Sequence, residues 1–345
     1  MDWLAMRRCS RTSSTFKVLR LLLLGQLVSL STVFMSLTTS IITQVLGVDA
    51  PLTQSLFTYA SLALVFGSIL LYRRHKPLIS WYWYVPLAFA DVQGNYLVNK
   101  AYQYTSITSV TLLDCWTIPW AIILTWIFLG TRYSLWQLSG ASMCVLGLCL
   151  VLLSDSWVGG GGDINDGSRP ILGDVLVIVG TFFYGTSNVG EEFFVKRKDL
   201  VEMVSMLGVF GFLISLVEVS VIELKTLASV KWSVEIVLSF LGYALSSFMF
   251  YSIAPFVLKM SGATMFNLSL LTSDMWAVVF RVFLYHQKVD WLYFLAFAIV
   301  GIGLVIYSLV EKDSVPAPTT EDDNLDTEYQ MIYDESTPSG NDSRG

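Results

Sequence analysis

The sequence predicts an all-α polytopic membrane protein with ten transmembrane helices arranged as a five-plus-five inverted repeat. The 345-residue chain is 54% hydrophobic and only 14% charged, and its mean hydropathy is +0.62. Its charges fall in short clusters between apolar runs of about 20 residues, which is the length at which a helix crosses a hydrocarbon core about 30 Å thick. Two parts of the chain also repeat each other in sequence.

Ten apolar runs are the candidate transmembrane helices. In chain order they are residues 21–46, 53–72, 81–100, 105–129, 136–153, 172–190, 202–224, 234–256, 262–284 and 291–310. We do not expect the first run to be a cleavable signal peptide. Its apolar core exceeds the usual length of roughly 7–15 residues, and no small-x-small cleavage site follows it.

The repeat is visible when residues 105–153 are aligned without gaps on residues 261–309, a shift of 156 positions. Identical residues then pair at Thr108 and Thr264, Leu112 and Leu268, Trp120 and Trp276, Ala121 and Ala277, Gly147 and Gly303, and Leu148 and Leu304. Each half holds five spans, so the second half enters the membrane upside down. Inverted repeats commonly place a solute site near the midplane, between the halves.

Lysine and arginine residues predict the orientation of the chain, because they are enriched in cytosolic connections. With the N-terminus in the cytosol, 15 of them fall on the cytosolic side and five on the far side. We therefore expect both termini in the cytosol, and a plasma membrane or a Golgi or endosomal membrane as the location. The predicted segments are a basic N-terminal tail (1–17), the first repeat (18–153), a Gly-rich non-cytosolic linker (154–170), the second repeat (171–310) and a disordered acidic cytosolic tail (311–345).

Three aspartates lie inside predicted spans. Asp91 is about halfway along the third span, Asp114 is near the middle of the fourth, and Asp274 is near the middle of the ninth. In the repeat frame Asp114 and Asp274 are four positions apart, which is about one turn on the same helix face. A charge at the centre of a membrane helix costs roughly 2.5–3.5 kcal/mol on insertion scales. We therefore expect these acids to face protein or water and to bind a solute or a proton.

Other polar residues accompany these acids. Asn95 and Asn99 follow Asp91 at helical spacing, and Tyr102 continues the stripe. For the two amides, solute binding and hydrogen bonds that hold helices together both remain open. Arg281 lies seven residues after Asp274, on the same face, where it forms either a structural ion pair or a substrate contact.

Glutamates near the ends of spans have more ordinary interpretations. Glu192 is spaced to form a local surface ion pair with Lys196, four residues further on. Glu218 lies within the seventh span and is a weaker site candidate. Glu223 is expected to be solvated near the far interface.

The sign of the midplane charges constrains the solute, because three acids stand against one arginine. The phosphates of a nucleotide or nucleotide-sugar would need several Arg or Lys partners. The predicted cavity therefore prefers a cationic, zwitterionic or neutral polar solute. Burial favours the uncharged form of a carboxyl group, so the candidates for carrying a coupling proton are Asp91, Asp114, Asp274 and Glu191.

Two stretches resemble a known family. ADVQGNYLVNKAYQYTSITSVTLLDC at residues 90–115 is similar to the signature stretch of the F subgroup of solute carrier family 35, within the drug/metabolite transporter superfamily, and GDVLVIVGTFFYGTSNVGEEFFVKR at residues 173–197 resembles the sixth span of the same group. The resemblance covers about residues 15–312. It implies ten helices, an inverted repeat and alternating access. It also implies carriage of small solutes, which are typically nucleotide-sugars in the family and look nucleobase- or nucleoside-related in this subgroup.

The shared motifs contain Asp91, Asn95, Tyr96, Tyr102, Tyr104, Asp114, Asn188, Glu191 and Glu192. The charge argument adds Asp274 and Arg281. The candidate substrate-binding residues are therefore Asp91, Asn95, Tyr96, Tyr102, Tyr104, Asp114, Asn188, Asp274 and Arg281. A secondary active transporter is the function that these residues favour.

Two other functions stay open beside a transporter. A Golgi nucleotide-sugar antiporter would need a basic midplane, and a non-transporting scaffold or receptor would signal through the C-terminal tail. In that tail, Tyr329 and Ile332 fit a cytosolic sorting signal of the form tyrosine, two residues, bulky apolar residue. Trafficking adaptors are therefore expected partners, beside the solute and the lipid bilayer.

The sequence does not indicate an enzyme. It contains no His-Glu-x-x-His motif and no serine elbow, and neither His75 nor His286 lies in a predicted span. We expect no cofactor, no metal site and no nucleic-acid partner. The absence of a nucleotide-binding motif also argues against direct use of ATP.

Overall fold

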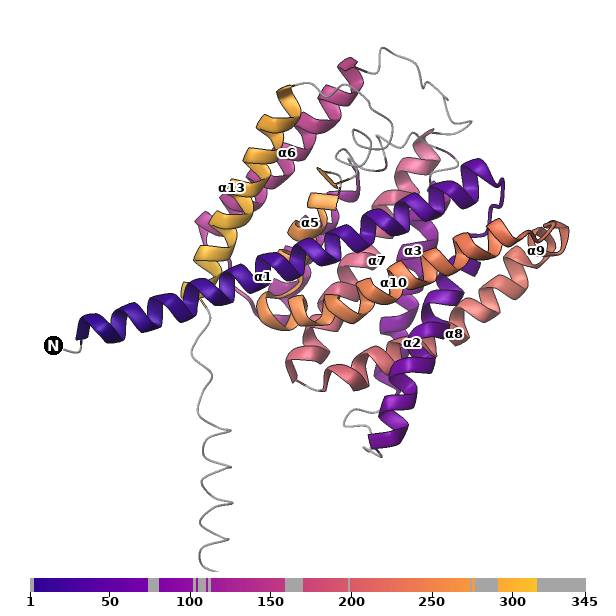
Figure 1. The fold of residues 1–345 in the computed structure, drawn as a ribbon, viewed down its shortest axis with the longest axis horizontal. Coiled ribbons are helices and arrows are strands. Elements are labelled where there is room, and N and C mark those ends of the chain that lie inside the picture. The colour runs from indigo at the N-terminus through magenta and orange to yellow at the C-terminus, as the bar shows by residue number, and fades with distance from the viewer. Residues whose placement is uncertain are drawn as a thin grey trace, which may run out of the picture.

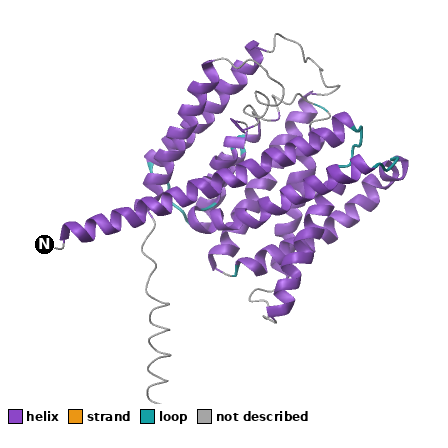
Figure 2. Ribbon diagram, in the orientation of Figure 1, coloured by secondary structure: helices purple, strands orange, loops and turns teal. Residues whose placement is uncertain are grey.

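A computed structural model describes residues 3–73, 81–101, 104, 110, 113–158, 170–197, 199–273, 275–276 and 291–314. The regular elements within these ranges are all helical (Figure 2). The α-helices are α1 (Trp3–Ser40), α2 (Pro51–Arg73), α3 (Tyr84–Ala101), α5 (Thr117–Leu124), α6 (Leu135–Val158), α7 (Pro170–Arg197), α8 (Leu200–Glu218), α9 (Leu224–Ser229), α10 (Val234–Ser261), α11 (Ala263–Leu270) and α13 (Trp291–Ser314). Shorter helical segments are η1 (Ile41–Val45), η2 (Trp81–Trp83), η3 (Thr125–Leu129) and η4 (Val219–Glu223).

Each of the ten predicted spans overlaps a described helix. Five helical stretches are long and apolar enough to cross a membrane, and they are Val18–Thr43, Pro51–Arg73, Ile171–Arg197, Leu200–Ser229 and Val234–Ser261. Two shorter apolar helices, Thr117–Leu129 and Phe294–Val310, fall in the fourth and tenth predicted spans. The prediction of an all-helical, multi-pass membrane protein is therefore confirmed at this level.

Segment boundaries differ from the prediction at several helix ends. At the C-terminal end, α13 continues to Ser314, whereas the disordered tail was expected from residue 311. The chain is helical from Trp3, so much of the expected N-terminal tail extends the first span as α1. α6 continues to Val158, whereas the linker was expected from Ser154. α7 begins at Pro170, and proline suits the first position of a helix.

Four helix pairs organise the bundle: α2 with α8, α3 with α7, α1 with α10, and α6 with α13 (Figure 1). α3 also packs on α8, and α10 on α2, so these helices form a central group. The outer surface carries exposed apolar side chains such as Leu71, Leu135 and Val221, which are 79%, 83% and 79% exposed. Extensive apolar exposure of this kind suits a surface that contacts lipid rather than water.

α6 and α13 pack closely and antiparallel because small residues line their contact. A Cβ atom added at Gly140 would meet the backbone of Gly303 and Tyr307, whereas one added at Gly147 would meet Ala296 and Val300. Cys144 Sγ donates to the carbonyl oxygen of Val300 at 3.6 Å. Small residues at such contacts let two membrane helices approach closely and gain van der Waals energy.

We expect Gly303→Ala to destabilise this contact. The added Cβ would lie 2.7 Å from Cys144 Sγ and 2.7 Å from the carbonyl oxygen of Gly140, and backbone cannot move aside cheaply. Overpacking of this kind costs roughly 1–3 kcal/mol, so the thermal unfolding midpoint of the purified protein should fall. Gly301→Ala is the matched control, since an added Cβ there has no atom within 4 Å. Equal midpoints for the two variants would contradict the packing described for Gly303.

Candidate functional site

Four helices, α2, α3, α7 and α10, converge on the carboxylate of Asp91, which is 4% exposed. Its Oδ2 accepts hydrogen bonds from the hydroxyls of Tyr59 and Tyr251, both at 2.6 Å. Its Oδ1 accepts one from Ser187 Oγ at 3.1 Å. Each donor comes from a different helix, so the carboxylate holds three neighbouring helices to α3.

Asn95 extends this network by one helical turn. Its Nδ2 donates to Tyr59 Oη at 3.2 Å, to Tyr251 Oη at 3.3 Å and to the carbonyl oxygen of Asp91 at 3.0 Å. Tyr184 Oη donates to Asn95 Oδ1 at 3.0 Å. We call this network the central cluster, and its members are Tyr59, Asp91, Asn95, Tyr184, Ser187 and Tyr251.

Helical spacing and one glycine position the cluster. Asp91 and Asn95 are four residues apart on α3, and Tyr184 and Ser187 are three apart on α7, so each pair shares a helix face. At the contact of α3 with α7, Gly94 lets the ring of Tyr184 lie against the α3 backbone. A Cβ at Gly94 would fall 2.8 Å from Tyr184 Cδ1. A larger residue at this position would move the hydroxyl of Tyr184 away from Asn95.

A narrow pocket adjoins the cluster. Its lining residues come from α1, α2, α3 and α10, and they are Met35, Ser55, Thr58, Tyr59, Asn95, Tyr243 and Tyr251. The pocket has no space for a water molecule. Opposite Tyr59, Thr58 and Ser247 pair their hydroxyls at 2.7 Å. The polar groups around Asp91 therefore bond to one another.

A second acid lies beside Asp91. Glu191 follows Ser187 by one turn on α7, is 3% exposed, and lies within electrostatic range of Asp91 and Tyr251. Within the described ranges the ion pairs are Arg73 with Asp199 and Lys196 with Glu192, and neither involves the central cluster. The two buried acids are therefore not neutralised by any lysine or arginine that the structure describes.

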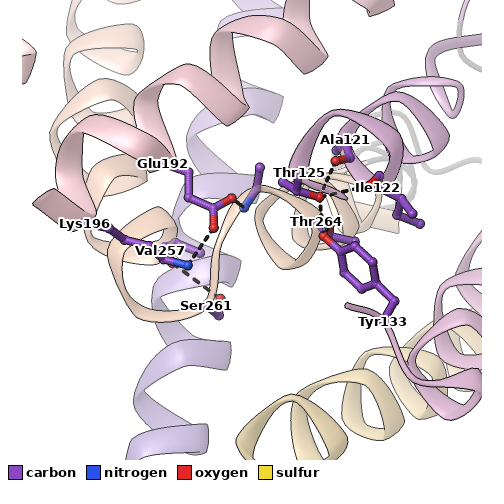
Figure 3. A network of polar contacts seen from close by, with 10 residues as sticks. Ala121, Ile122, Thr125, Tyr133, Glu192, Lys196, Val257, Ser261 and Thr264 are labelled. Carbon is purple, nitrogen blue, oxygen red and sulfur yellow. Dashed lines mark hydrogen bonds and ion pairs between the residues drawn. The ribbon is translucent and has the colours of Figure 1, made fainter. Parts of the chain in front are cut away.

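Glu192 points the other way and joins α7 to the start of α11 (Figure 3). Its Oε1 accepts from Lys196 Nζ at 2.6 Å, and its Oε2 accepts from the backbone N–H of Ala263 at 2.7 Å. Gly262 makes this possible, since its φ is +91° and a Cβ there would lie 2.6 Å from Glu192 Oε1. The predicted pair with Lys196 forms, but it is not a surface pair, because Glu192 is 3% exposed and binds a helix N-terminus.

Glu223 makes a similar contact with the N-terminus of α2. Its carboxylate accepts from Leu52 N at 2.7 Å, from Thr53 N at 2.8 Å and from Thr53 Oγ1 at 2.7 Å. The expectation that Glu223 is solvated was wrong, since this side chain is 4% exposed. The orphan N–H groups of a helix start attract a carboxylate and satisfy its lone pairs away from water.

Tyr133, just before α6, links two further elements in Figure 3. Its hydroxyl pairs with Thr264 Oγ1 of α11 at 2.7 Å and also with Thr125 Oγ1 of η3. Glu192 and Tyr133 thus hold the first turn of α11 from two sides.

The structure brings only some of the predicted site residues together. Asp91, Asn95 and Glu191 share the central region. Asn188 instead donates to Asn267 Oδ1 on α11 at 2.9 Å. Tyr96 lies within electrostatic range of Tyr104, Glu218 and Glu223, towards the end of α8. Asp114 is exposed and lies just before α5, where its carbonyl oxygen accepts from Thr117 Oγ1 at 2.7 Å. The predicted residues outside the described ranges are Tyr102, Asp274, Arg281, Tyr329 and Ile332.

Sequence reasoning missed the four hydroxyl partners of the cluster, Tyr59, Tyr184, Ser187 and Tyr251. Tyr184 and Ser187 lie within a stretch that resembles the family, but a single tyrosine or serine in an apolar span reads equally well as packing. One signal was present for Tyr251. It follows Asn95 by the repeat shift of 156 positions, so the two hold equivalent places in the halves.

Comparisons with known proteins found similar sequences and a similar fold. A family model described as solute carrier family 35 (SLC35F) matches residues 14–309. The chain is similar to "Solute carrier family 35 member F2" of Mus musculus, with 34% identity over 317 residues that cover 90% of this chain and 84% of that protein. The protein of the same name from Xenopus tropicalis is 36% identical over 292 residues, covering 82% of this chain and 75% of that one.

A solved crystal structure has a similar fold. It superimposes with a TM-score of 0.66 at 16% identity, covering 84% of this chain and 99% of that chain. At that identity the likeness concerns the fold alone.

We expect the hydroxyls of Tyr59 and Tyr251 to stabilise the fold jointly, because both donate to one oxygen of Asp91. Hydrogen bonds to a charged group contribute roughly 1.5–3 kcal/mol each. Tyr59→Phe and Tyr251→Phe should therefore each lower the thermal unfolding midpoint, and the double variant should deviate from additivity. Tyr72→Phe is the control, since Tyr72 is 90% exposed. If each single variant lowers the midpoint no more than Tyr72→Phe does, and the double variant lowers it by the sum of the two, a shared role is contradicted.

Proposed function

The chain belongs to the F subgroup of solute carrier family 35, and we propose that this multi-pass membrane protein is a secondary active transporter of a small polar, cationic or nucleobase- or nucleoside-like organic solute. The observation that carries the solute class is the Asp91 carboxylate. It is buried where four helices meet, and no described lysine or arginine neutralises it. A site of this sign attracts a cation or hydrogen-bond donors.

The alternative of a Golgi nucleotide-sugar antiporter fits less well. A solute with two phosphates would be repelled by Asp91 and Glu191 and would need several Arg or Lys partners. The described helices supply hydroxyls, amides and aromatic rings around the pocket instead. Arg281 is the basic midplane residue of the sequence, and on this proposal it pairs with an acid rather than with phosphate.

A ten-helix inverted repeat is part of the proposal, and its support lies in α6 and α13. The shift of 156 positions places Leu135–Val158 on Trp291–Ser314 in the sequence. These two helices pack antiparallel, as equivalent helices of inverted halves must. The same shift relates the pairing of α3 with α7 to that of α10 with α1.

The symmetry axis of such a repeat would pass through the central cluster. Residues that are equivalent in two halves can touch each other only near the axis that relates the halves. Asn95 and Tyr251 are equivalent by the 156 shift, and they form a hydrogen bond at 3.3 Å. Cys144 and Val300 are a second such pair. This supports a solute site between the halves, at mid-membrane.

Alternating access requires contacts between the halves on both sides of the site, each broken in turn. On the proposed far side, Glu223 of the second half holds Thr53 of the first. On the proposed cytosolic side, Tyr84 Oη of the first half donates to Glu202 Oε1 of the second at 3.0 Å. With both contacts formed and no room for water in the pocket, the arrangement is the one expected of an occluded transporter. The proposal also keeps both termini in the cytosol, as the distribution of Lys and Arg predicts.

The remaining predicted roles are kept as parts of this proposal. The solute path is lined by Asp91, Asn95, Tyr96, Tyr102, Tyr104, Asp114, Asn188, Asp274 and Arg281, and a coupling proton is carried by Asp91, Asp114, Asp274 or Glu191. The location is the plasma membrane or a Golgi or endosomal membrane. Tyr329 and Ile332 engage trafficking adaptors.

We expect Asp91→Asn to reduce solute uptake at least about tenfold, because loss of a charge-assisted contact costs roughly 1.5–3 kcal/mol. The assay is uptake into proteoliposomes from one pool of nucleobases, nucleosides, organic cations and nucleotide-sugars, read by mass spectrometry. Asp199→Asn is the control, since Asp199 forms an exposed pair with Arg73. Enrichment of a nucleotide-sugar would contradict the proposed solute class. Wild-type uptake by Asp91→Asn would remove Asp91 from the site, and no uptake by the wild type would favour a scaffold.

A further inference from the structure

Asp91 and Glu191 are neighbouring buried acids that differ in the number of hydrogen-bond donors around them. Asp91 receives three hydroxyl hydrogen bonds, at 2.6, 2.6 and 3.1 Å. Among the described residues, none donates a hydrogen bond to the carboxyl group of Glu191, although it is 3% exposed. Hydrogen-bond donors favour the charged form of a buried carboxyl group, and their lack favours the neutral form.

Their placement also disfavours a negative charge on both acids at once. Glu191 lies one turn beyond Ser187, whose hydroxyl is bonded to Asp91, so both acids face the contact of α3 with α7. Two negative charges in a site of low polarity repel each other strongly. The contrast in hydrogen-bond donors therefore favours the charge on Asp91 and the proton on Glu191.

The other titratable groups around the two acids already have partners or, like Tyr243 on α10, interact with Asp91 itself. Tyr59 on α2 and Tyr251 on α10 are bonded to Asp91, and Tyr184 on α7 is bonded to Asn95. Glu202 on α8 receives the hydroxyl of Tyr84. The next acid on α7, Glu192, is paired with Lys196 and with the start of α11. The described helices α5 and α11 contain no titratable residue.

We propose that Glu191 carries an exchangeable proton that leaves when a cationic group of the solute binds beside Asp91. The proposal rests on the transport function above and deepens it. One proton leaves the oxygen of Glu191 for water on the open side, and one monovalent cation enters, so the site keeps one net negative charge in both states. The protein would then exchange one proton for one cationic solute.

Linkage makes this exchange reciprocal. If a bound cation promotes release of the proton from Glu191, a proton on Glu191 weakens binding of the cation by the same factor. The repeat allows one such unit in each molecule, because the positions equivalent to Asp91 and Glu191 are Ser247 and Met35, which cannot ionise here. One proton site therefore serves the two halves.

Infrared spectroscopy of the purified protein tests the proton without any solute. At neutral pH the wild type should show the carbonyl stretch of a buried protonated carboxylic acid. Glu191→Gln should lose this band, whereas Asp91→Asn and the exposed control Glu235→Gln should keep it. Persistence of the band in Glu191→Gln, or its absence from the wild type, would overturn the proposal even if transport is normal.

Transport assays test the coupling, using the solute enriched in the pooled uptake experiment. With a pH gradient, wild-type vesicles should accumulate the solute against its own gradient. Glu191→Gln should lose this accumulation but still exchange labelled for unlabelled solute, which also shows that it is folded. Wild-type accumulation by Glu191→Gln would refute the coupling role. Absence of all uptake in the wild type would instead refute the transport function and leave the infrared result to decide the proton site.

Discussion

The need to satisfy one buried carboxylate organises the centre of this bundle. Asp91 cannot reach water, so its lone pairs depend on hydroxyls from α2, α7 and α10. Those donors hold three helices to α3, and Asn95 ties the same tyrosines together one turn away. Without the aspartate these hydroxyls would lose their shared acceptor. The charge therefore has a structural role as well as the proposed role in binding, and any solute must replace some of these bonds.

The helices were largely predictable, because apolar runs near membrane length and glycine or proline at their ends are local features of the sequence. Asp91, Asn95 and Glu191 were also singled out as candidates from the sequence, since polar residues are rare inside such runs. Their partners were not, because Tyr59 and Tyr251 meet Asp91 through helix pairings that no local pattern encodes. Glu192 and Glu223 were misjudged for the same reason. Each lies near a helix end, where solvation is the usual outcome, but another helix begins against each of them.

The two halves resemble each other in sequence and differ in polarity. Trp276 donates its Nε1–H to Gln26 Oε1 at 2.9 Å, whereas its repeat equivalent Trp120 packs edge-on against Phe182, the equivalent of Gln26. Asp91 likewise corresponds to Ser247. The same backbone framework thus holds a charged and an uncharged version of one contact set. Because only one of the two equivalent positions carries the acid, two similar segments form one charged site rather than two.

α6 and α13 meet as two copies of one helix would. Gly140 and Ala296 occupy the same repeat position, and each remains small where the partner helix crosses it. Because Cys144 contacts its own equivalent, Val300, the surface of each helix is complementary to its counterpart turned end for end. This is the isologous geometry of a homodimer, closed within a single polypeptide. On the proposed five-plus-five repeat, a free half would expose a surface suited to pairing with a second identical half, and covalent linkage would keep that self-association inside the chain.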